Sequence, residues 1–374
     1  MKILHLLSGG NIGGIEMLCR DISELSHEQN EFCFLYSGGV MADEMEKKNV
    51  HVYRFYKENL FIRLYKLFRL VKVSGYDIVI VHHEGIGIYS FYLLLAYCFR
   101  KIKYIKYLHC SFEKKYFYSG KTGKDWLYYT ILKRALYRSD CVVAVSEFVK
   151  KSYCVEFNYP PDKVKVIYNG IRIREKAERN IQIPEKDTIT LLYIGRLVDE
   201  KGIALLLRAV KKLLDGGENV ELEILGDGNK RQEYEAFSKE LGIKDRVFFE
   251  GYQLQKQPFY DKSKIFVYPS ICEEAFGISI VEAMGEEMMC VASDIGGIPE
   301  IIEDGKDGFL FRSGDVDSLT EAIRKAISCT KGQEYSEIKM MARRKSQKYD
   351  VTETIENLED IFSRLVRDNQ WKKN

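Results

Sequence analysis

The chain lacks the patterns that mark several common classes of protein. Its nine cysteines show neither a Cys-x-x-Cys pair nor metal-like spacing, so reduced thiols in a cytoplasmic protein fit best. The apolar run at the N-terminus is too short for a signal peptide. Residues 86–99 are the most apolar stretch, but they are too short to span a bilayer, and we expect a buried helix there. With a net charge of only +2 and no recognised motif, a nucleic-acid partner is not expected.

Length and charge distribution set further limits. A chain of 374 residues predicts two domains or three. Residues 1–176 carry 28 Lys and Arg against 18 Asp and Glu, whereas the remainder carries 29 against 37. This asymmetry favours a basic N-terminal half that meets an anionic partner.

Apolar strand-like runs alternate with helical segments along the chain, which predicts parallel sheets. One series of strands runs from KILHLLS to KVKVIYNG, and a second begins at TITLLYIG and ends at MCVASD. The charged stretch 171–187, with Pro184 and no apolar period, is the predicted boundary. We therefore expect an α/β protein with two facing, doubly wound, Rossmann-like domains and a ligand cleft between them.

Two loops that follow predicted strands are suited to phosphate. In GRLVDEKG, Arg196 and Lys201 offer a forked guanidinium and a second positive charge, although an ordinary solvated loop explains them equally well. The loop SGGNIGGIE permits a tight turn, but its spacing differs from the Gly-x-Gly-x-x-Gly fingerprint. A structural turn and an anion cradle therefore both remain open for this loop.

Three histidines end predicted strands. His109 follows YIKYL and could bind a sugar hydroxyl or a phosphate oxygen, although a lone histidine is more often structural. His82 and His83 follow DIVIV and are interpreted as structural or cleft-lining residues. The single Asp-x-Asp, Asp315 and Asp317, precedes an apolar-periodic segment and is better explained as a helix cap than as a metal site. No essential metal or other cofactor is expected.

Glu274 and Glu282 lie eight residues apart in EEAFGISIVEAMGEEMMC, between two predicted strands. Gly277 between them allows close approach or a positive φ, and the free amides of a new helix favour an anion. One carboxylate before this anion site and one on the helix could bracket a sugar and a ribose. The pattern favours an enzyme that handles a nucleotide-sugar.

These residues carry a family resemblance. The pieces GGIE, VIYNGI, YIGRLVDEKG, ILGDG, VFFEGY, EAFGISIVEAM and SDIGGIPEIIEDGKDGFL resemble, in order and over nearly the whole chain, those of retaining GT-B glycosyltransferases of family 4. The resemblance implies an N-terminal acceptor-binding domain (1–175), a C-terminal nucleotide-sugar-binding domain (186–345) and a final helix within 346–374 that packs back toward the first domain. It also implies a hexosyl transfer that needs no metal.

The resemblance also assigns roles. Arg196 and Lys201 would bind the donor diphosphate, Glu274 the donor sugar and Glu282 the ribose. His109 would lie near the reacting sugar. Gly14 would face the diphosphate, and Glu16 and His83 would lie on the acceptor side. The remaining donor-binding residues implied are Asn169, Tyr252, Phe276, Gly277, Ile278 and Ser279. One departure stands out: Glu287 and Met289 occupy positions where the family has Gly and Pro, which puts the conformation of that loop in question.

The expected partners are a nucleotide-sugar, with UDP favoured, and a glycan or polyprenyl-linked saccharide acceptor, as in bacterial surface polysaccharide synthesis. Residues 57–72 combine Lys and Arg with Leu, Phe and Ile at helical spacing. They predict either peripheral binding to an anionic membrane or an ordinary surface helix. Two other functions stay open: a nucleotide-sugar epimerase of the same fold, and a noncatalytic binding subunit of a polysaccharide-synthesis complex.

Overall fold

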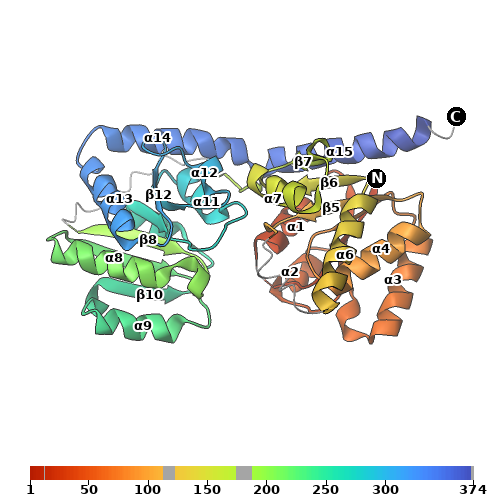
Figure 1. Cartoon of the computed structure of the whole chain (residues 1–374), viewed down its shortest axis with the longest axis horizontal. Helices are drawn as coiled ribbons and strands as arrows, with labels where there is room; N and C mark the ends of the chain where they lie inside the picture. Colours follow the sequence, from red (N-terminus) through yellow and green to blue (C-terminus); the bar gives the residue numbers. More distant parts are fainter. Residues whose placement is uncertain (12, 113–122, 174–187, 372–374) are drawn as a thin grey trace. The chain divides into compact units, whose positions relative to one another are not determined.

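The chain forms two compact units, seen in a computed structural model that describes residues 1–371 except 12, 113–122 and 174–187. Unit 1 comprises Met1–Gly170 and Val351–Asn374, and unit 2 comprises Ile171–Asp350 (Figure 1). Most of the predicted boundary stretch, 171–187, lies outside the described residues.

Unit 1 is built on a seven-stranded sheet in the order β3-β2-β1-β4-β5-β6-β7, with every strand pair parallel. The strands are β1 (Lys2–Leu7), β2 (Gln29–Phe34), β3 (Val52–Arg54), β4 (Ile78–Val81), β5 (Lys103–Leu108), β6 (Cys141–Ala144) and β7 (Val164–Val166). The helices are α1 (Gly14–Leu25), α2 (Val40–Lys47), α3 (Leu60–Ser74), α4 (Ile86–Cys98), α6 (Gly123–Arg138), α7 (Glu147–Phe157) and α15 (Val351–Trp371), with short 3₁₀ turns η1 (Phe55–Lys57) and η2 (Pro161–Lys163).

The helices of unit 1 other than α7 form two groups. One group contains α1, α2 and α15, and the other contains α3, α4 and α6. The C-terminal helix α15 is fixed to this unit by Glu359, whose carboxylate accepts hydrogen bonds from Ser26 Oγ (2.7 Å) and from the His27 amide (2.7 Å). Unit 1 is therefore completed by a segment that follows unit 2 in the sequence.

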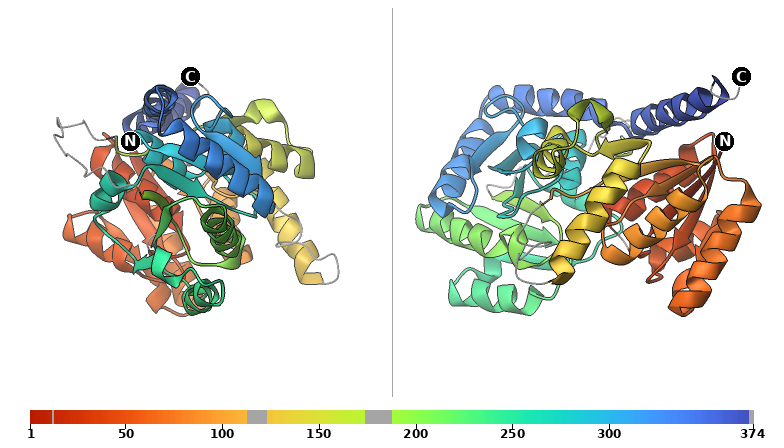
Figure 2. Two further views of the ribbon diagram at one scale, coloured as in Figure 1. Left: turned by 90° about the vertical axis from the view of Figure 1, so that its left-hand side faces the viewer. Right: turned by 45° about the vertical axis from the view of Figure 1, so that its right-hand side comes forward.

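Unit 2 has a six-stranded parallel sheet in the order β10-β9-β8-β11-β12-β13. Its strands are β8 (Ile189–Ile194), β9 (Val220–Leu225), β10 (Val247–Gly251), β11 (Ile265–Tyr268), β12 (Met289–Asp294) and β13 (Phe309–Arg312). Its helices are α8 (Ile203–Asp215), α9 (Arg231–Glu240), α10 (Gln257–Lys262), α11 (Ile278–Gly285), α12 (Ile298–Ile301), α13 (Val316–Cys329) and α14 (Glu334–Ser346), with 3₁₀ turns η3 (Asp199–Lys201), η4 (Lys244–Arg246) and η5 (Gln347–Tyr349). Helices α8, α9 and α13 pack together, as do α11 and α14 (Figure 2).

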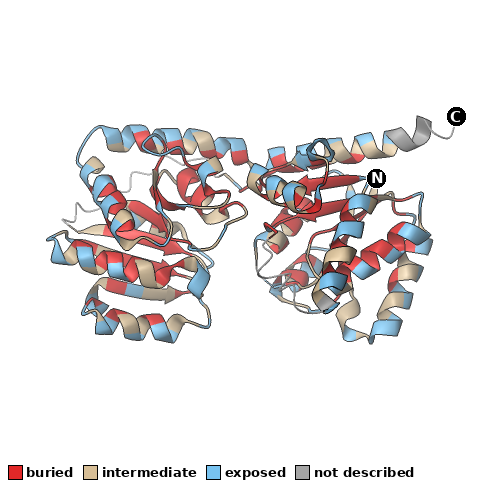
Figure 3. Cartoon of the chain, viewed as in Figure 1, coloured by how far each residue is buried: buried red, intermediate tan, exposed pale blue. Residues whose placement is uncertain are grey.

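The core of each unit is its sheet, because most strands are largely buried and are covered by helices. Strands β1, β4, β5, β6, β8, β11 and β12 are almost entirely buried, and the helices alternate buried and exposed positions (Figure 3). The predicted strands are all present, and the α/β prediction is confirmed. The sequence reading missed β3 and β13, because both are short and only partly buried.

Smaller predictions can also be compared with the structure. Residues 86–98 form helix α4 as predicted, but the helix is only partly buried, since Leu94 and Tyr97 are exposed. No helix in the described part of the chain combines the length and hydropathy that a bilayer crossing requires. Asp315 caps α13, since its carboxylate accepts from the amides of Asp317 (2.9 Å) and Ser318 (3.0 Å), which confirms the cap. None of the nine cysteines, all within the described residues, forms a disulfide.

Each sheet has one place where the direction of strand progression reverses. This switch point lies between β1 and β4 in unit 1 and between β8 and β11 in unit 2. Ligands of open parallel sheets bind beyond the carboxyl ends of the strands at such points. The segments that follow these four strands, up to the first residue of the next helix, carry Gly14, His83, Lys201 and Glu274. The topology alone therefore makes both ends candidate sites.

Candidate functional site

The unit 2 site begins with the loop after β8. Arg196 is exposed, and Lys201 ends the short turn η3. Lys201 Nζ lies 2.5 Å from Glu274 Oε1 and donates to Tyr268 Oη at 3.0 Å. The structure thus joins Lys201 to Glu274, which lie 73 positions apart in sequence.

Glu274 is held on several sides. Ser270 Oγ also donates to Glu274 Oε1 at 2.5 Å, and both Lys201 and Glu274 keep only 12% of their side-chain surface exposed. Burial, followed by the charge of Glu274, raises the pKa of Tyr268 well above its ordinary value, so this hydroxyl stays protonated. The carboxylate is therefore a fixed hydrogen-bond acceptor beside a fixed positive charge.

Glycines make this arrangement possible. Gly296 has φ +63°, and a Cβ atom there would lie 2.4 Å from the Glu274 carbonyl oxygen, so no larger residue fits without movement. The amide of Gly297 donates to the same carbonyl at 2.7 Å. Gly277, with φ +124°, precedes α11 and leaves the amides of Ile278 and Ser279 at the start of the helix. The backbone of the Glu274 loop is thereby fixed against the loop after β12.

Glu282 has a separate environment on α11. Its Oε2 lies 2.8 Å from Lys256 Nζ, and it does not share the partners of Glu274. Burial, followed by the Glu282 charge, raises the pKa of Tyr260 well above its ordinary value. The two glutamates therefore sit in two distinct polar clusters, as expected for separate roles rather than a shared proton.

Three further predicted donor-binding residues are divided between the two units. Phe276 is buried against the ring of Tyr349, with ring centroids 5.3 Å apart. Tyr252 follows β10 and is exposed. Asn169 belongs to unit 1 and is buried, with its Oδ1 making no hydrogen bond to any described residue.

The unit 1 site lies after β1, β4 and β5. Glu16, in the first turn of α1, is buried, and its Oε1 lies 3.2 Å from His83 Nε2. The Ser8 amide donates to His83 Nδ1 at 3.2 Å, so the proton of a neutral His83 is on Nε2 and points to Glu16. No carboxylate partner was predicted for His83, because Glu16 comes from the first turn of a helix far away in sequence. Gly14 is the first residue of α1, two residues before Glu16.

His109 follows β5 and is buried beside His82, with His82 Nδ1 and His109 Nε2 3.0 Å apart. Burial, followed by the charge of nearby Lys106, lowers the pKa of His109 well below its usual value. Lys106 itself is fully buried in β5, where its Nζ donates to the Tyr107 carbonyl (3.2 Å), and burial lowers its pKa to about 8. The sequence analysis overlooked Lys106, although a lysine inside an apolar strand signals a buried polar partner.

Two family models match consecutive parts of the chain: Glycosyltransferase Family 4 over residues 12–175 and Glycosyl transferases group 1 over residues 174–345. An uncharacterised glycosyltransferase of Methanocaldococcus jannaschii is 35% identical over 51% of this chain and 52% of its own length. The lipopolysaccharide 1,2-N-acetylglucosaminetransferase of Salmonella typhimurium is 31% identical over 50% of this chain and 53% of its own length. The chain spans about half the length of most of the curated relatives it matches.

Solved structures match over the whole chain. Anabaena HepE in complex with UDP has a TM-score of 0.83 at 22% identity and covers 97% of this chain and 100% of its own. A glycosyltransferase from Rickettsia africae has a TM-score of 0.78 at 20% identity, with 98% of each chain covered. With two Rossmann-like units and both family models matched in succession, the chain belongs to the group 1, family 4 glycosyltransferases and has the GT-B fold.

Proposed function

We propose that the chain transfers a hexosyl residue from a nucleotide-diphosphate sugar, with UDP-sugar favoured, to a glycan or polyprenyl-linked acceptor in surface polysaccharide synthesis. The transfer would retain the anomeric configuration and need no essential metal. Support for UDP comes from the HepE structures with UDP and with UDP-glucose. Support for the acceptor class comes from the Salmonella lipopolysaccharide enzyme and from a Staphylococcus aureus capsular polysaccharide glycosyltransferase.

The observation that carries this proposal is the Lys201–Glu274 pair at the carboxyl end of β8 and β11. Breaking a sugar–phosphate bond builds positive charge on the sugar and negative charge on the departing diphosphate. A carboxylate and an ammonium fixed side by side match these two charges, and positioned charges of this kind stabilise a transition state. The exposed Arg196 and the amides of Ile278 and Ser279 supply further donors for the diphosphate.

The remaining roles follow the same division. Glu282, on its own face of α11, would bind the ribose hydroxyls, and Tyr252 would lie near the base. Gly14 and His109 would serve the donor from unit 1, while Glu16 and His83 would serve the acceptor. No nucleophile is assigned, so we favour front-face attack by the acceptor, assisted by the leaving phosphate.

The test is transfer by Arg196→Ala and Lys201→Ala. Each variant loses a charged hydrogen bond worth about 1.5–3 kcal/mol, so each should transfer about 10- to 100-fold more slowly from a UDP-sugar. Lys211→Ala is the matched control, because Lys211 is also a lysine near Lys201 in sequence but pairs, among the described residues, with Asp215 on the surface of α8. Wild-type rates in both site variants would remove the diphosphate assignment.

The same assay separates the alternatives. A transferase releases free UDP only with an acceptor and gives a product whose anomeric configuration is readable by NMR. An epimerase would convert the UDP-sugar without any acceptor, and a binding subunit would do neither. Activity that survives a chelator supports metal independence, whereas activity restored only by a divalent cation would contradict it.

Peripheral membrane binding through α3 belongs to the same proposal. The helix buries Leu67 and Val71, yet it leaves Phe61 82% and Tyr65 64% exposed. Lys57, Arg69 and Lys72 lie on or beside the same helix, whereas Arg63 donates to the carbonyls of Phe55 and Glu58. Large apolar side chains left in water beside basic ones fit insertion at an anionic lipid surface.

A further inference from the structure

Four side chains form a continuous hydrogen-bonded row across the sheet of unit 1. They come from β2, β1 and the ends of β4 and β5, which are consecutive neighbours in the sheet. Asn30 Oδ1 lies 2.9 Å from His5 Nε2, His5 Nδ1 lies 2.9 Å from His82 Nε2, and His82 Nδ1 lies 3.0 Å from His109 Nε2. We call these residues the imidazole row. Its three histidines are buried, and neighbouring rings are stacked.

The hydrogen bonds of the imidazole row all run in the same direction, and Asn30 at one end sets that direction. Asn30 Nδ2 donates to the Glu28 carbonyl at 3.0 Å, so the amide oxygen is the atom that faces His5. An amide oxygen only accepts, which places the His5 proton on Nε2. A neutral imidazole carries one N–H and one bare nitrogen. His5 Nδ1 must therefore accept from His82 Nε2–H, and His82 Nδ1 must accept from His109 Nε2–H.

The surroundings keep each ring neutral. Burial lowers the pKa of His5 to about 4, and it lowers the pKa values of His82 and His109 well below their usual value. Lys106 on β5 and His83 after β4 add repulsion toward protonation of His109. Across neutral pH, the row can therefore hold only one proton per ring.

Other titratable groups border the row. Cys19 lies on α1 against His5 and His82, and burial, followed by the Glu16 and Asp21 charges, raises the pKa of its thiol well above the ordinary value. The ring of Tyr107 stacks on His109 with centroids 4.3 Å apart, and its hydroxyl stays protonated because burial raises its pKa. Neither Cys19 nor Tyr107 is charged at neutral pH, so neither favours a protonated histidine. The carboxylates that act on Cys19 are those of Glu16 and Asp21.

We infer that Asn30, His5 and His82 are positioning residues that hold His109 as its Nε2–H tautomer, so that His109 Nδ1 acts only as a hydrogen-bond acceptor. Its ligand is then a hydroxyl that donates, not a phosphate oxygen, which would need a donor. Naming that hydroxyl as one of the donor sugar rests on the proposed function. The acceptor character of His109 rests on the row alone.

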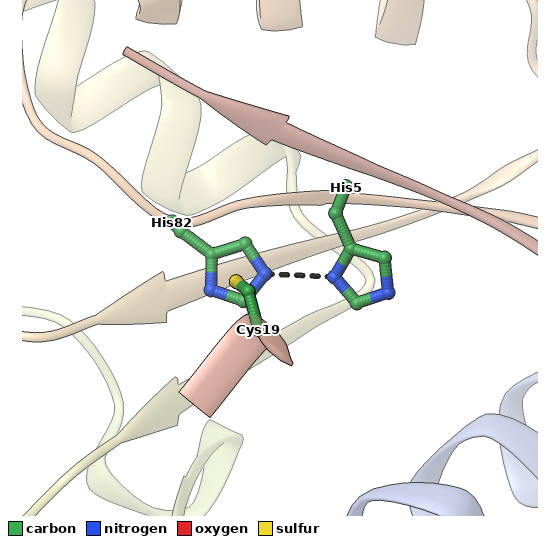
Figure 4. Close-up of side chains that lie close together, drawn as sticks. All are labelled: His5, Cys19 and His82. Carbon is green, nitrogen blue, oxygen red and sulfur yellow. Dashed lines mark hydrogen bonds between the residues drawn. The ribbon is translucent and has the colours of Figure 1, made fainter. Parts of the chain in front are cut away.

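A metal site is the competing explanation for part of the row, because ligand atoms of His5, Cys19 and His82 lie within 4.8 Å of one another. Figure 4 shows the two rings facing each other nitrogen to nitrogen, with Cys19 beside them. Their 2.9 Å separation is a hydrogen-bond distance. Two nitrogens on one tetrahedral zinc would lie about 3.3 Å apart, given Zn–N bonds of about 2.0 Å. Together with the protonated thiol, this favours the shared proton over a metal.

The first test is ¹⁵N NMR of the histidine rings in the ligand-free protein. His5, His82 and His109 should all show the Nε2–H pattern, with no titration from pH 8 to pH 5. The exposed His27 and His51 provide reference signals from solvent-facing rings. An Nδ1–H signal for His109, or loss of the His5 and His82 ring protons on adding Zn²⁺, would overturn the inference.

Two variants test the function of the row. Asn30→Leu removes the terminal acceptor, whereas Asn30→Asp keeps an oxygen there. Asn30→Leu should give a mixture of His109 tautomers and lower kcat/KM for the donor by about tenfold, the effect of one well-placed hydrogen bond. UDP affinity should be unchanged, and Asn30→Asp should raise the pKa of His5, because a carboxylate beside the ring favours its charged form. An unaltered tautomer and rate in Asn30→Leu would contradict the positioning role.

Fluorinated donors identify the ligand. In a panel of monofluoro-UDP-glucoses, each analogue replaces one hydroxyl by fluorine, which cannot donate a hydrogen bond. At one position the replacement should slow transfer by the wild-type enzyme. The same analogue should be transferred by His109→Ala no more slowly than UDP-glucose is. If no position behaves this way while UDP-glucose is used, the hydroxyl assignment is wrong. If no UDP-sugar is turned over at all, the proposed function fails, and the NMR result still decides the row.

Discussion

At the residue scale, the loop between α11 and β12 shows how one unusual backbone position is kept. Glu287 has φ +60°, in the left-handed region. The family resemblance implies glycine at this position. Its side chain lies 3.6 Å from Arg343. Met289 begins β12 and is fully buried. The segment GEEMMC therefore keeps the turn, with Glu287 in a strained backbone conformation.

This strain leads to a stability prediction. Glu287→Gly and Glu287→Ala both lose the contact with Arg343, but only glycine is free of the clash between Cβ and the backbone in this conformation. We expect Glu287→Gly to be more stable than Glu287→Ala by about 1 kcal/mol. Urea unfolding of unit 2 would measure the difference. Equal stability of the two variants would show that the turn relaxes.

At the element scale, helix α3 is where the proposal of membrane binding can be tested. Phe61→Ser and Tyr65→Ser remove exposed apolar groups, so neither should lower stability by more than about 0.5 kcal/mol. Both should weaken flotation with anionic liposomes, and added salt should weaken it further. Val155→Ser, on the exposed side of α7, is the control. Flotation that is absent in the wild type, or unchanged in the α3 variants, would refute the proposal.

The sequence was most informative about the helices and strands. Long apolar runs such as TITLLYIG predict strands because a strand buried on both faces has no polar alternation. Asp315 was predictable because a cap acts on amides two and three residues away. The contacts of Lys201 with Glu274, and of His5 with His82, were not predictable, because strand order brings them together and no local spacing records it. His5 was a missed signal: a polar residue in the middle of a buried strand needs a partner.

At the scale of the whole molecule, histidine is unevenly shared. All six histidines lie in unit 1, and unit 2 has none. The pKa of His5 is about 4 in the folded protein and about 6.5 when unfolded, so the unfolded state binds protons more readily as the pH falls. Stability from neutral His5 is complete above pH 6.5 and is lost as the pH falls toward 4. His82 and His109 act in the same direction.

Unit 1 should therefore be the acid-sensitive half. At pH 5 the cost from His5 alone is about 2 kcal/mol. Both tryptophans, Trp126 and Trp371, belong to unit 1, so tryptophan fluorescence reports its unfolding while circular dichroism reports both units. From pH 7 to pH 5, the fluorescence transition should shift to lower temperature more than the remaining transition does. His5→Gln should reduce the shift, and His51→Gln should not. Equal shifts for both units would contradict this.

The chain passes between the units twice, at Gly170–Ile171 and at Asp350–Val351, and the two crossings lie side by side because the Ile171 amide donates to the Tyr349 carbonyl at 2.8 Å. During synthesis on a ribosome, all of unit 2 therefore emerges before α15 exists to pack on α1. The sheet of unit 1 therefore lacks its last helix while unit 2 is synthesised. Unit 2, in contrast, is an uninterrupted segment whose own strands and helices are complete when its last residue appears.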